Sequence, residues 1–133
     1  MGYPTETLAD LKMSVAFIKW QDEFYRSCGK PSDSVNQRMF TATWYPGTTM
    51  LHHEKVRMLL HEVFGINFHP ITGDPVCDEQ FRNYIVELDD ATKILHDPAT
   101  GTPLNFGDMS MDVFLEAREH IDKGEIFKIL DMK

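Results

Sequence analysis

Apolar residues recur at steps of three and four along four separate segments of this chain. In the first segment, residues 5–28, the pattern runs through Leu8, Leu11 and Val15, and Gly29 follows as a stop. This spacing places apolar side chains on one face of an α-helix. Such a face must be buried against another element, so we predict an all-α fold, a compact bundle of four to five helices.

The other three segments are predicted helices with recognisable start and stop signals. Counting all four predicted helices in chain order, glycines also follow the second and the fourth. Residues with capping side chains precede the first, the third and the fourth. Pro75 suits the first helical position of the third helix. The predicted helices are residues 5–28 with Thr5 as cap, 49–64 before Gly65, 75–95 after Asp74, and the segment from Asp108 or Ser110 to Gly124.

Loops containing proline and glycine separate these helices. Two of the loops, residues 69–75 and 96–103, both carry Thr-Gly between prolines, which we interpret as shared turn chemistry and not as a repeat. The segment Val35–Tyr45 fits either a short helix or an extended stretch, and we favour a helix followed by a loop.

Length and composition predict one domain, residues 1–133, because the chain has 133 residues, 42% hydrophobic and 26% charged. No stretch approaches the roughly 20 apolar residues of a membrane span, and the first residues lack the layout of a signal peptide. We therefore expect a cytoplasmic protein without a membrane partner. The two cysteines, Cys28 and Cys77, are expected to be reduced and buried.

The charge is strongly asymmetric along the chain. The formal net charge is −8, which disfavours direct binding of duplex nucleic acid through its phosphates. Residues 1–73 are neutral overall, so the whole excess lies in residues 74–133. An acidic half of this kind serves solubility, or it attracts a divalent cation or a basic protein surface.

Three carboxylates are candidate metal ligands. Glu87 and Asp90 are three residues apart on the third predicted helix and so share a face. Glu62 on the second helix faces them if the two helices pack antiparallel. Clustered carboxylate oxygens suit Mg²⁺ or Mn²⁺, the ions that hold a triphosphate for hydrolysis. Solvent-exposed surface charge is the alternative interpretation.

Four blocks, in order, resemble the all-α nucleotide pyrophosphohydrolases of the MazG-like group. The resemblance covers about residues 15–123, and its blocks are residues 24–31, 56–63, 86–91 and 111–117. It implies a helical Mg²⁺-dependent or Mn²⁺-dependent enzyme that cleaves a nucleoside triphosphate between its α and β phosphates.

The resemblance gives the metal role to Glu62, Glu87 and Asp90, which would also be the catalytic residues. Lys93 is a candidate for neutralising the substrate phosphate. Where the family has two further glutamates, this chain has His61 and Gly65, so the metal site is altered or degenerate.

The alternative function is a small acidic protein that binds a basic surface of a partner, as phage-type inhibitors do. Summed charge is enough for such docking, and Asp112, Glu116 and Glu119 are the candidate contact residues. The aromatic content exceeds what a small bundle needs for its core, which favours a homodimer. The residues concerned are Phe17, Trp20, Phe24, Phe64, Phe81 and Phe114.

Overall fold

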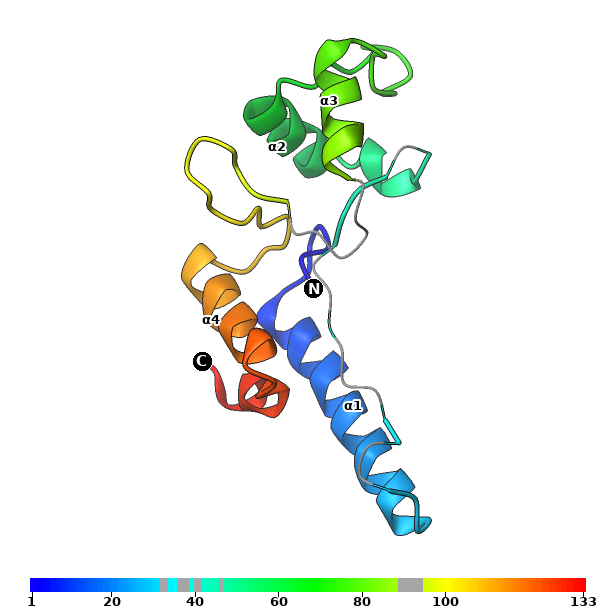
Figure 1. Cartoon of the computed structure of the whole chain (residues 1–133), viewed down its shortest axis with the longest axis vertical. Coiled ribbons are helices and arrows are strands. Elements are labelled where there is room, and N and C mark those ends of the chain that lie inside the picture. Colours follow the sequence, from blue (N-terminus) through cyan, green and yellow to red (C-terminus); the bar gives the residue numbers. More distant parts are fainter. Residues whose placement is uncertain (32–33, 36–38, 40–41, 46, 89–94) are drawn as a thin grey trace. The chain divides into compact units, whose positions relative to one another are not determined.

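A computed structural model of the chain is mainly helical, which confirms the predicted fold class. It describes residues 1–31, 34–35, 39, 42–45, 47–88 and 95–133. These residues contain four α-helices, two 3-10 helices and no β-strand (Figure 1). The helices are α1 (Leu8–Ser27), η1 (Thr49–His52), α2 (Glu54–Phe64), α3 (Glu79–Glu87), α4 (Met111–Asp122) and η2 (Ile126–Asp131). None of the helices in this part of the chain is long and apolar enough to cross a membrane.

The chain divides into two compact units. Unit 1 contains Met1, residues 5–40 and residues 107–133, and unit 2 contains residues 2–4 and 41–106. Each unit has a hydrophobic core of its own. The prediction that residues 1–133 behave as a single domain stays a prediction.

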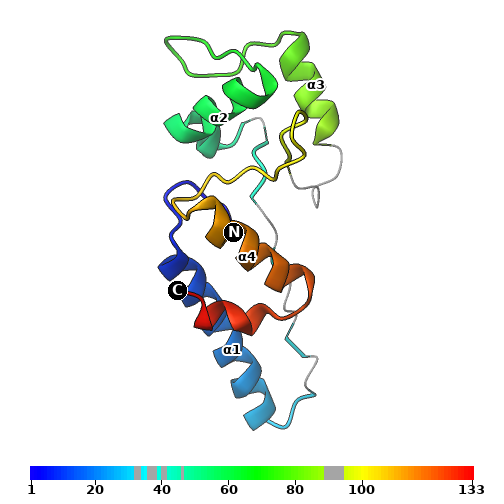
Figure 2. The same cartoon turned by 90° about the vertical axis from the view of Figure 1, so that its left-hand side faces the viewer.

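Unit 1 is built from α1, α4 and η2, which lie side by side in two views (Figures 1 and 2). The helix α1 begins with a capping box in which the Thr7 hydroxyl accepts from the Asp10 N–H and the Asp10 carboxylate accepts from the Thr7 N–H. The predicted cap at Thr5 was therefore wrong by two residues, because Thr7 has the acidic side chain three positions later that a capping box needs.

The core of unit 1 closes where η2 packs against α1 and α4. Ser110, one of the two predicted caps, begins α4 by accepting a hydrogen bond from the Val113 N–H. Gly124, at φ 71°, follows this helix and lets the chain turn back. The fully or almost fully buried side chains are Leu11, Val15, Phe114, Ala117, Ile126 and Ile129.

Unit 2 holds η1, α2 and α3 around Tyr84, of which 1% is exposed. The Tyr84 ring contacts Phe64 at 5.3 Å between centroids, and its hydroxyl donates to the Trp44 carbonyl at 2.7 Å. Val56 and Leu60 supply the α2 side of this core. The predicted packing partners α2 and α3 therefore share one core.

Two predicted helix starts were placed too early. The segment from Thr49 forms the separate η1 before α2 begins at Glu54. The helix α3 begins at Glu79 with Asp78 as its cap, because Asp74 and Pro75 belong to a β-hairpin. At its other end, α3 is described to Glu87, and Leu95 is a buried residue of a second hairpin.

The two Thr-Gly loops form hairpins with the same hydrogen bonds. In the first, His69 N–H donates to the Asp74 carbonyl and Gly73 N–H to the His69 carbonyl; in the second, Asp97, Thr102 and Gly101 repeat this arrangement. An isolated β-bridge closes each hairpin. A side chain at the first position accepts backbone N–H groups in both, His69 Nδ1 in one and Asp97 Oδ1 in the other. Shared turn chemistry thus explains the similarity.

Two other predictions concern the connecting segments. The helix predicted in Val35–Tyr45 lies mostly outside the described residues, and residues 42–45 are irregular. Cys28 and Cys77 are free, as expected, but both are exposed, so their predicted burial was wrong. Each lies at the edge of a helix, where the chain meets solvent.

The substitution Tyr84→Phe should lower the free energy of unfolding by about 1–2 kcal/mol, because it leaves the buried Trp44 carbonyl without its donor. Urea unfolding at pH 7 measures this, with Tyr25→Phe on the exposed side of α1 as the control. Burial raises the pKa of Tyr84, so the wild type should also lose stability as the pH rises above about 10, and Tyr84→Phe should lack that loss. Equal stability of both variants would contradict the role of this hydrogen bond.

Candidate functional site

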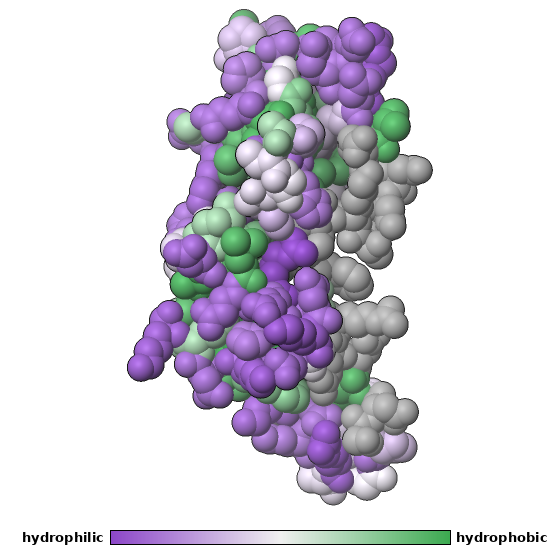
Figure 3. All heavy atoms as spheres, turned by 60° about the vertical axis from the view of Figure 1, so that its left-hand side comes forward, coloured by the Kyte–Doolittle hydropathy of each residue, from purple (hydrophilic) through white to green (hydrophobic). Residues whose placement is uncertain are grey.

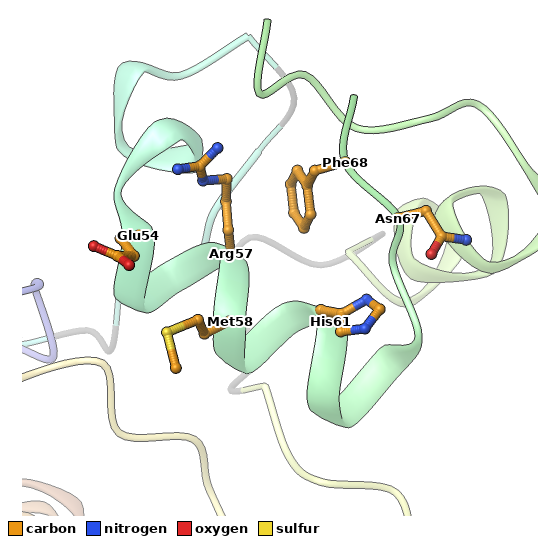
Figure 4. Close-up of a pocket in the computed structure, with 6 residues that line it drawn as sticks. All are labelled: Glu54, Arg57, Met58, His61, Asn67 and Phe68. Carbon is orange, nitrogen blue, oxygen red and sulfur yellow. The ribbon is translucent and has the colours of Figure 1, made fainter. Parts of the chain in front are cut away.

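A groove runs along the polar side of α2. It has a volume of about 360 Å³ and is lined by Glu54, Arg57, Met58, His61, Asn67 and Phe68. The ring of Phe68 lies between Arg57 on one side and His61 with Asn67 on the other (Figure 4). Helix α2 and the two residues before the 69–74 hairpin, Asn67 and Phe68, therefore supply the two walls.

Arg57 is the cation of this groove. Its side chain is half-buried, and its Nε is buried without a hydrogen-bond partner in the structure. The guanidinium lies against the hairpin backbone, since a Cβ on Gly73 would come within 2.8 Å of Arg57 Nη1. Since the guanidinium lines the groove, its other N–H groups are the donors that an anion would meet there.

His61 lies one turn after Arg57, on the same side of α2. Its Nδ1 is 2.9 Å from the Ile66 carbonyl. Because a carbonyl only accepts, Nδ1 carries the proton and Nε2 is left as the other polar atom of the ring. The sequence Gly65-Ile66, which turns the chain through a left-handed residue at φ 67°, fixes the position of this carbonyl.

Asn67 is fixed by the cap of α3. Its Nδ2 donates to Asp78 Oδ2 at 2.9 Å, and Asp78 Oδ1 accepts from the Phe81 N–H at 2.9 Å. The hydrogen bond from Phe81, followed by that from Asn67, holds the pKa of Asp78 below its ordinary value. The carboxylate thus joins the groove to the start of α3.

The remaining side chains of the groove are two apolar ones and one hydrogen-bond acceptor. Phe68 is partly buried against the unit 2 core, and Met58 is exposed beside it. Glu54 is exposed at the start of α2, and no ion pair with Arg57 is formed. The groove therefore combines an apolar floor, a guanidinium, an imidazole and one carboxylate acceptor.

The predicted metal ligands do not line this groove. Glu62 is exposed near the end of α2, and Glu87 is the last residue of α3. Asp90 and Lys93 lie outside the described residues. The start of α3 adjoins the end of α2, since Gln80 Cγ lies 3.5 Å from where a Cβ on Gly65 would be. Glu87 is seven residues further along, about 10 Å at 1.5 Å per residue. The convergence of the three carboxylates stays a prediction.

In the described part of the chain, no three side chains of His, Cys, Asp or Glu are grouped closely enough to hold a metal ion. Because Asp90 lies outside that part, this observation does not test the predicted set of Glu62, Glu87 and Asp90.

The predicted partner-binding acids share one face of α4. Asp112, Glu116 and Glu119 are exposed, whereas Phe114 and Ala117 on the other side are buried. The face of the molecule drawn in Figure 3 is largely hydrophilic, with apolar side chains scattered over it. Glu119 is bound by Lys123, and this hydrogen bond lowers the pKa of Glu119. Asp112 and Glu116 are thus the two acids of this face that no described cation neutralises.

Compared with protein-family models, curated proteins and solved structures, the chain gives no match. The likeness to nucleotide pyrophosphohydrolases therefore depends on its four sequence blocks alone.

Sequence reasoning missed the groove residues. Arg57 and His61 are four apart on the polar side of α2, and this pairing was a usable signal. Phe68 and Asn67 gave none, because only the hairpin brings them beside α2.

Replacing Asp78 should test the link between the α3 cap and the groove. We expect Asp78→Ala to lower the thermal midpoint at pH 7, because α3 loses its cap and Asn67 its acceptor. Because the pKa of Asp78 is lowered in the fold, its ionised carboxylate stabilises the protein above the unfolded pKa of about 3.9, and this stabilisation is lost as the pH falls further. The difference in stability from wild type should therefore shrink below about pH 4. Asp78→Asn, which keeps an acceptor without the charge, should have a smaller effect, and its difference from wild type should shrink over the same pH range because it also lacks the titrating carboxylate.

Proposed function

We propose that this protein binds a small organic phosphate, with nucleotides as the first candidates, in the groove along α2. The single observation that carries the proposal is Arg57, whose guanidinium lines the groove beside an apolar wall and forms no ion pair in the described part of the chain. Arginine pairs well with phosphate because its planar group offers several donors in a fixed fork.

The other groove residues suit the rest of such a ligand. Phe68 and Met58 supply surface for a ring, and the Glu54 carboxylate is an acceptor for a hydroxyl or amino group. Pockets of about 300–1,000 Å³ with a few placed polar groups are typical of small-molecule sites, and this groove lies at the lower end of that range. The nucleotide ligand also agrees with the resemblance to pyrophosphohydrolases.

Metal-dependent hydrolysis of that nucleotide is a further part of the proposal. It requires Glu62, Glu87 and Asp90 to hold Mg²⁺ or Mn²⁺ and is supported by the shared core of α2 and α3, the two helices that carry or precede these residues. A bound cation would polarise the phosphate and activate water.

Binding of phenyl phosphate, inorganic phosphate and nucleoside mono- and triphosphates can be measured by calorimetry without metal. We expect Arg57→Gln to weaken binding about tenfold or more, the effect of losing a charge-assisted hydrogen bond worth about 1.5–3 kcal/mol. Arg82→Gln, an exposed arginine of α3, is the matched control and should bind like wild type. Phenyl phosphate should bind more tightly than inorganic phosphate if Phe68 contributes.

The same titrations with Mn²⁺ separate binding from hydrolysis. Release of pyrophosphate that Glu62→Gln abolishes would support the enzyme, whereas binding that needs Arg57 but no metal supports a binding protein. If none of these compounds binds with or without Mn²⁺, both versions are wrong.

A second candidate is docking of the acidic α4 face on a basic partner. It is supported by the exposure of Asp112, Glu116 and Glu119 on one side of the helix, and it requires summed charge more than precise geometry. The homodimer and the cytoplasmic location predicted from sequence belong with either candidate.

An oligolysine peptide can represent a basic surface in a salt titration. Asp112→Lys with Glu116→Lys should weaken its binding at low salt and flatten the salt dependence, because two exposed negative charges are reversed. The control, Glu62→Lys with Glu79→Lys, makes the same change in net charge on unit 2. Equal loss in the two double variants would mean that net charge, and not the α4 face, attracts the peptide.

A further inference from the structure

The helix α1 has a second apolar face that the core of unit 1 does not use. We call it the aromatic stripe, formed by Met13, Phe17, Trp20 and Phe24. At 100° per residue it lies about 180° from the buried side of α1, which carries Leu11 and Val15. The four side chains are 65%, 57%, 55% and 52% exposed, in that order.

The rings of the stripe are already ordered against one another. Phe17 and Trp20 stack at 5.6 Å between centroids with 22° between planes, and Trp20 and Phe24 stack at 5.6 Å with 17°. Rings held in this way lose less conformational freedom on binding than independent side chains. The C-terminal part of α1, which carries Trp20 and Phe24, extends past α4 and η2 within unit 1 (Figures 1 and 2).

We propose that a second copy of the chain covers the aromatic stripe, with the two α1 helices antiparallel. The stripe residues are spaced by four, three and four positions, which is the spacing of a coiled-coil seam. The spacing of four, three and four is the same when it is counted from the C-terminal end of the helix. A twofold axis between Phe17 and Trp20 therefore places Phe17 against Trp20 of the second copy, and Met13 against its Phe24.

The exposed area is of the size that such a pair needs. Aromatic side chains offer about 150–250 Å² each, so half-exposed ones contribute about 100 Å², and the stripes of two copies about 800 Å². A standard interface of about 1,400 Å² that is about 60% apolar contains a similar amount. One stripe alone, about 400 Å², is as large an apolar patch as monomers ordinarily expose.

The positions that border the stripe accept this arrangement. Ser14 and Gln21 line one edge and meet each other across the twofold axis without charge. On the other edge Glu23 comes beside Ala16 of the second copy, so no like charges meet there. An identical surface on both copies is what a closed twofold dimer requires. This inference concerns unit 1 and is independent of the groove in unit 2.

Sedimentation equilibrium of the full chain tests the pairing. We expect the wild type to be a dimer at tens of micromolar and Phe17→Ser with Phe24→Ser to be a monomer with unchanged helical circular dichroism, since both side chains are exposed. Ile71→Ser, at an 88% exposed hairpin position, is the control and should remain dimeric. A monomeric wild type, including one that binds lipid vesicles through α1, would overturn the proposal, as would a dimer that survives the double substitution.

Cysteine cross-linking tests the antiparallel register. Two single-cysteine proteins are made in a Cys28→Ser, Cys77→Ser background, one with Ser14→Cys and the other with Gln21→Cys. A mixture of the two proteins should form a disulfide-linked heterodimer, whereas each protein by itself should form little disulfide dimer. The two positions are two helical turns apart in one chain, about 10 Å, too far for an internal bridge. Conversely, Cys28 should not cross-link to Cys28 of the second copy in the native chain. Rapid Cys28 cross-linking would indicate a parallel pair and overturn the register.

Discussion

The packing around Tyr84 is the interaction on which unit 2 depends. Isolated helices shorter than about 12–15 residues are marginal in water, and α2 and α3 have 11 and 9 residues. They are stable only because their apolar faces meet in one core, where the Tyr84 ring contacts α2 and its hydroxyl satisfies the Trp44 carbonyl. The groove along α2 follows from this packing, because the core fixes the outward direction of Arg57 and His61.

The 69–74 hairpin completes the groove by a different kind of interaction. Its backbone hydrogen bonds place Phe68 and Asn67 beside α2, while the Asp78 carboxylate holds Asn67 and begins α3. One carboxylate thus serves both a helix end and a wall of the groove. The equivalent 96–103 hairpin has the same turn but carries Asp97 where the first has His69. The identical turns show that local hydrogen bonding, and not surrounding contacts, determines this conformation.

In unit 1 the long helix α1 has two faces with different roles. Leu11 and Val15 are buried with α4 and η2, while Phe17, Trp20 and Phe24 stack on the other side in solvent. Of the two apolar sides of α1, the described part of the chain covers one. The aromatic residues that favoured a dimer on composition alone are therefore of two kinds, since Phe114 is fully buried in the core and Phe17 is not.

The sequence by itself determined the helical fold and the stop at Gly124, because apolar spacing and capping chemistry are local properties. It left two candidates for the cap of α4, Asp108 and Ser110, of which the structure selects Ser110. It misplaced the starts of α1 and α3, since several nearby residues can cap. The capping box with Asp10 selects Thr7, and the hairpin that contains Asp74 and Pro75 leaves Asp78 as the cap of α3. The exposure of the aromatic stripe and the site around Arg57 were decided by the tertiary structure alone. Both depend on which face of a helix the core covers and on which distant segment lies beside it, and neither is encoded in the spacing of residues along one helix.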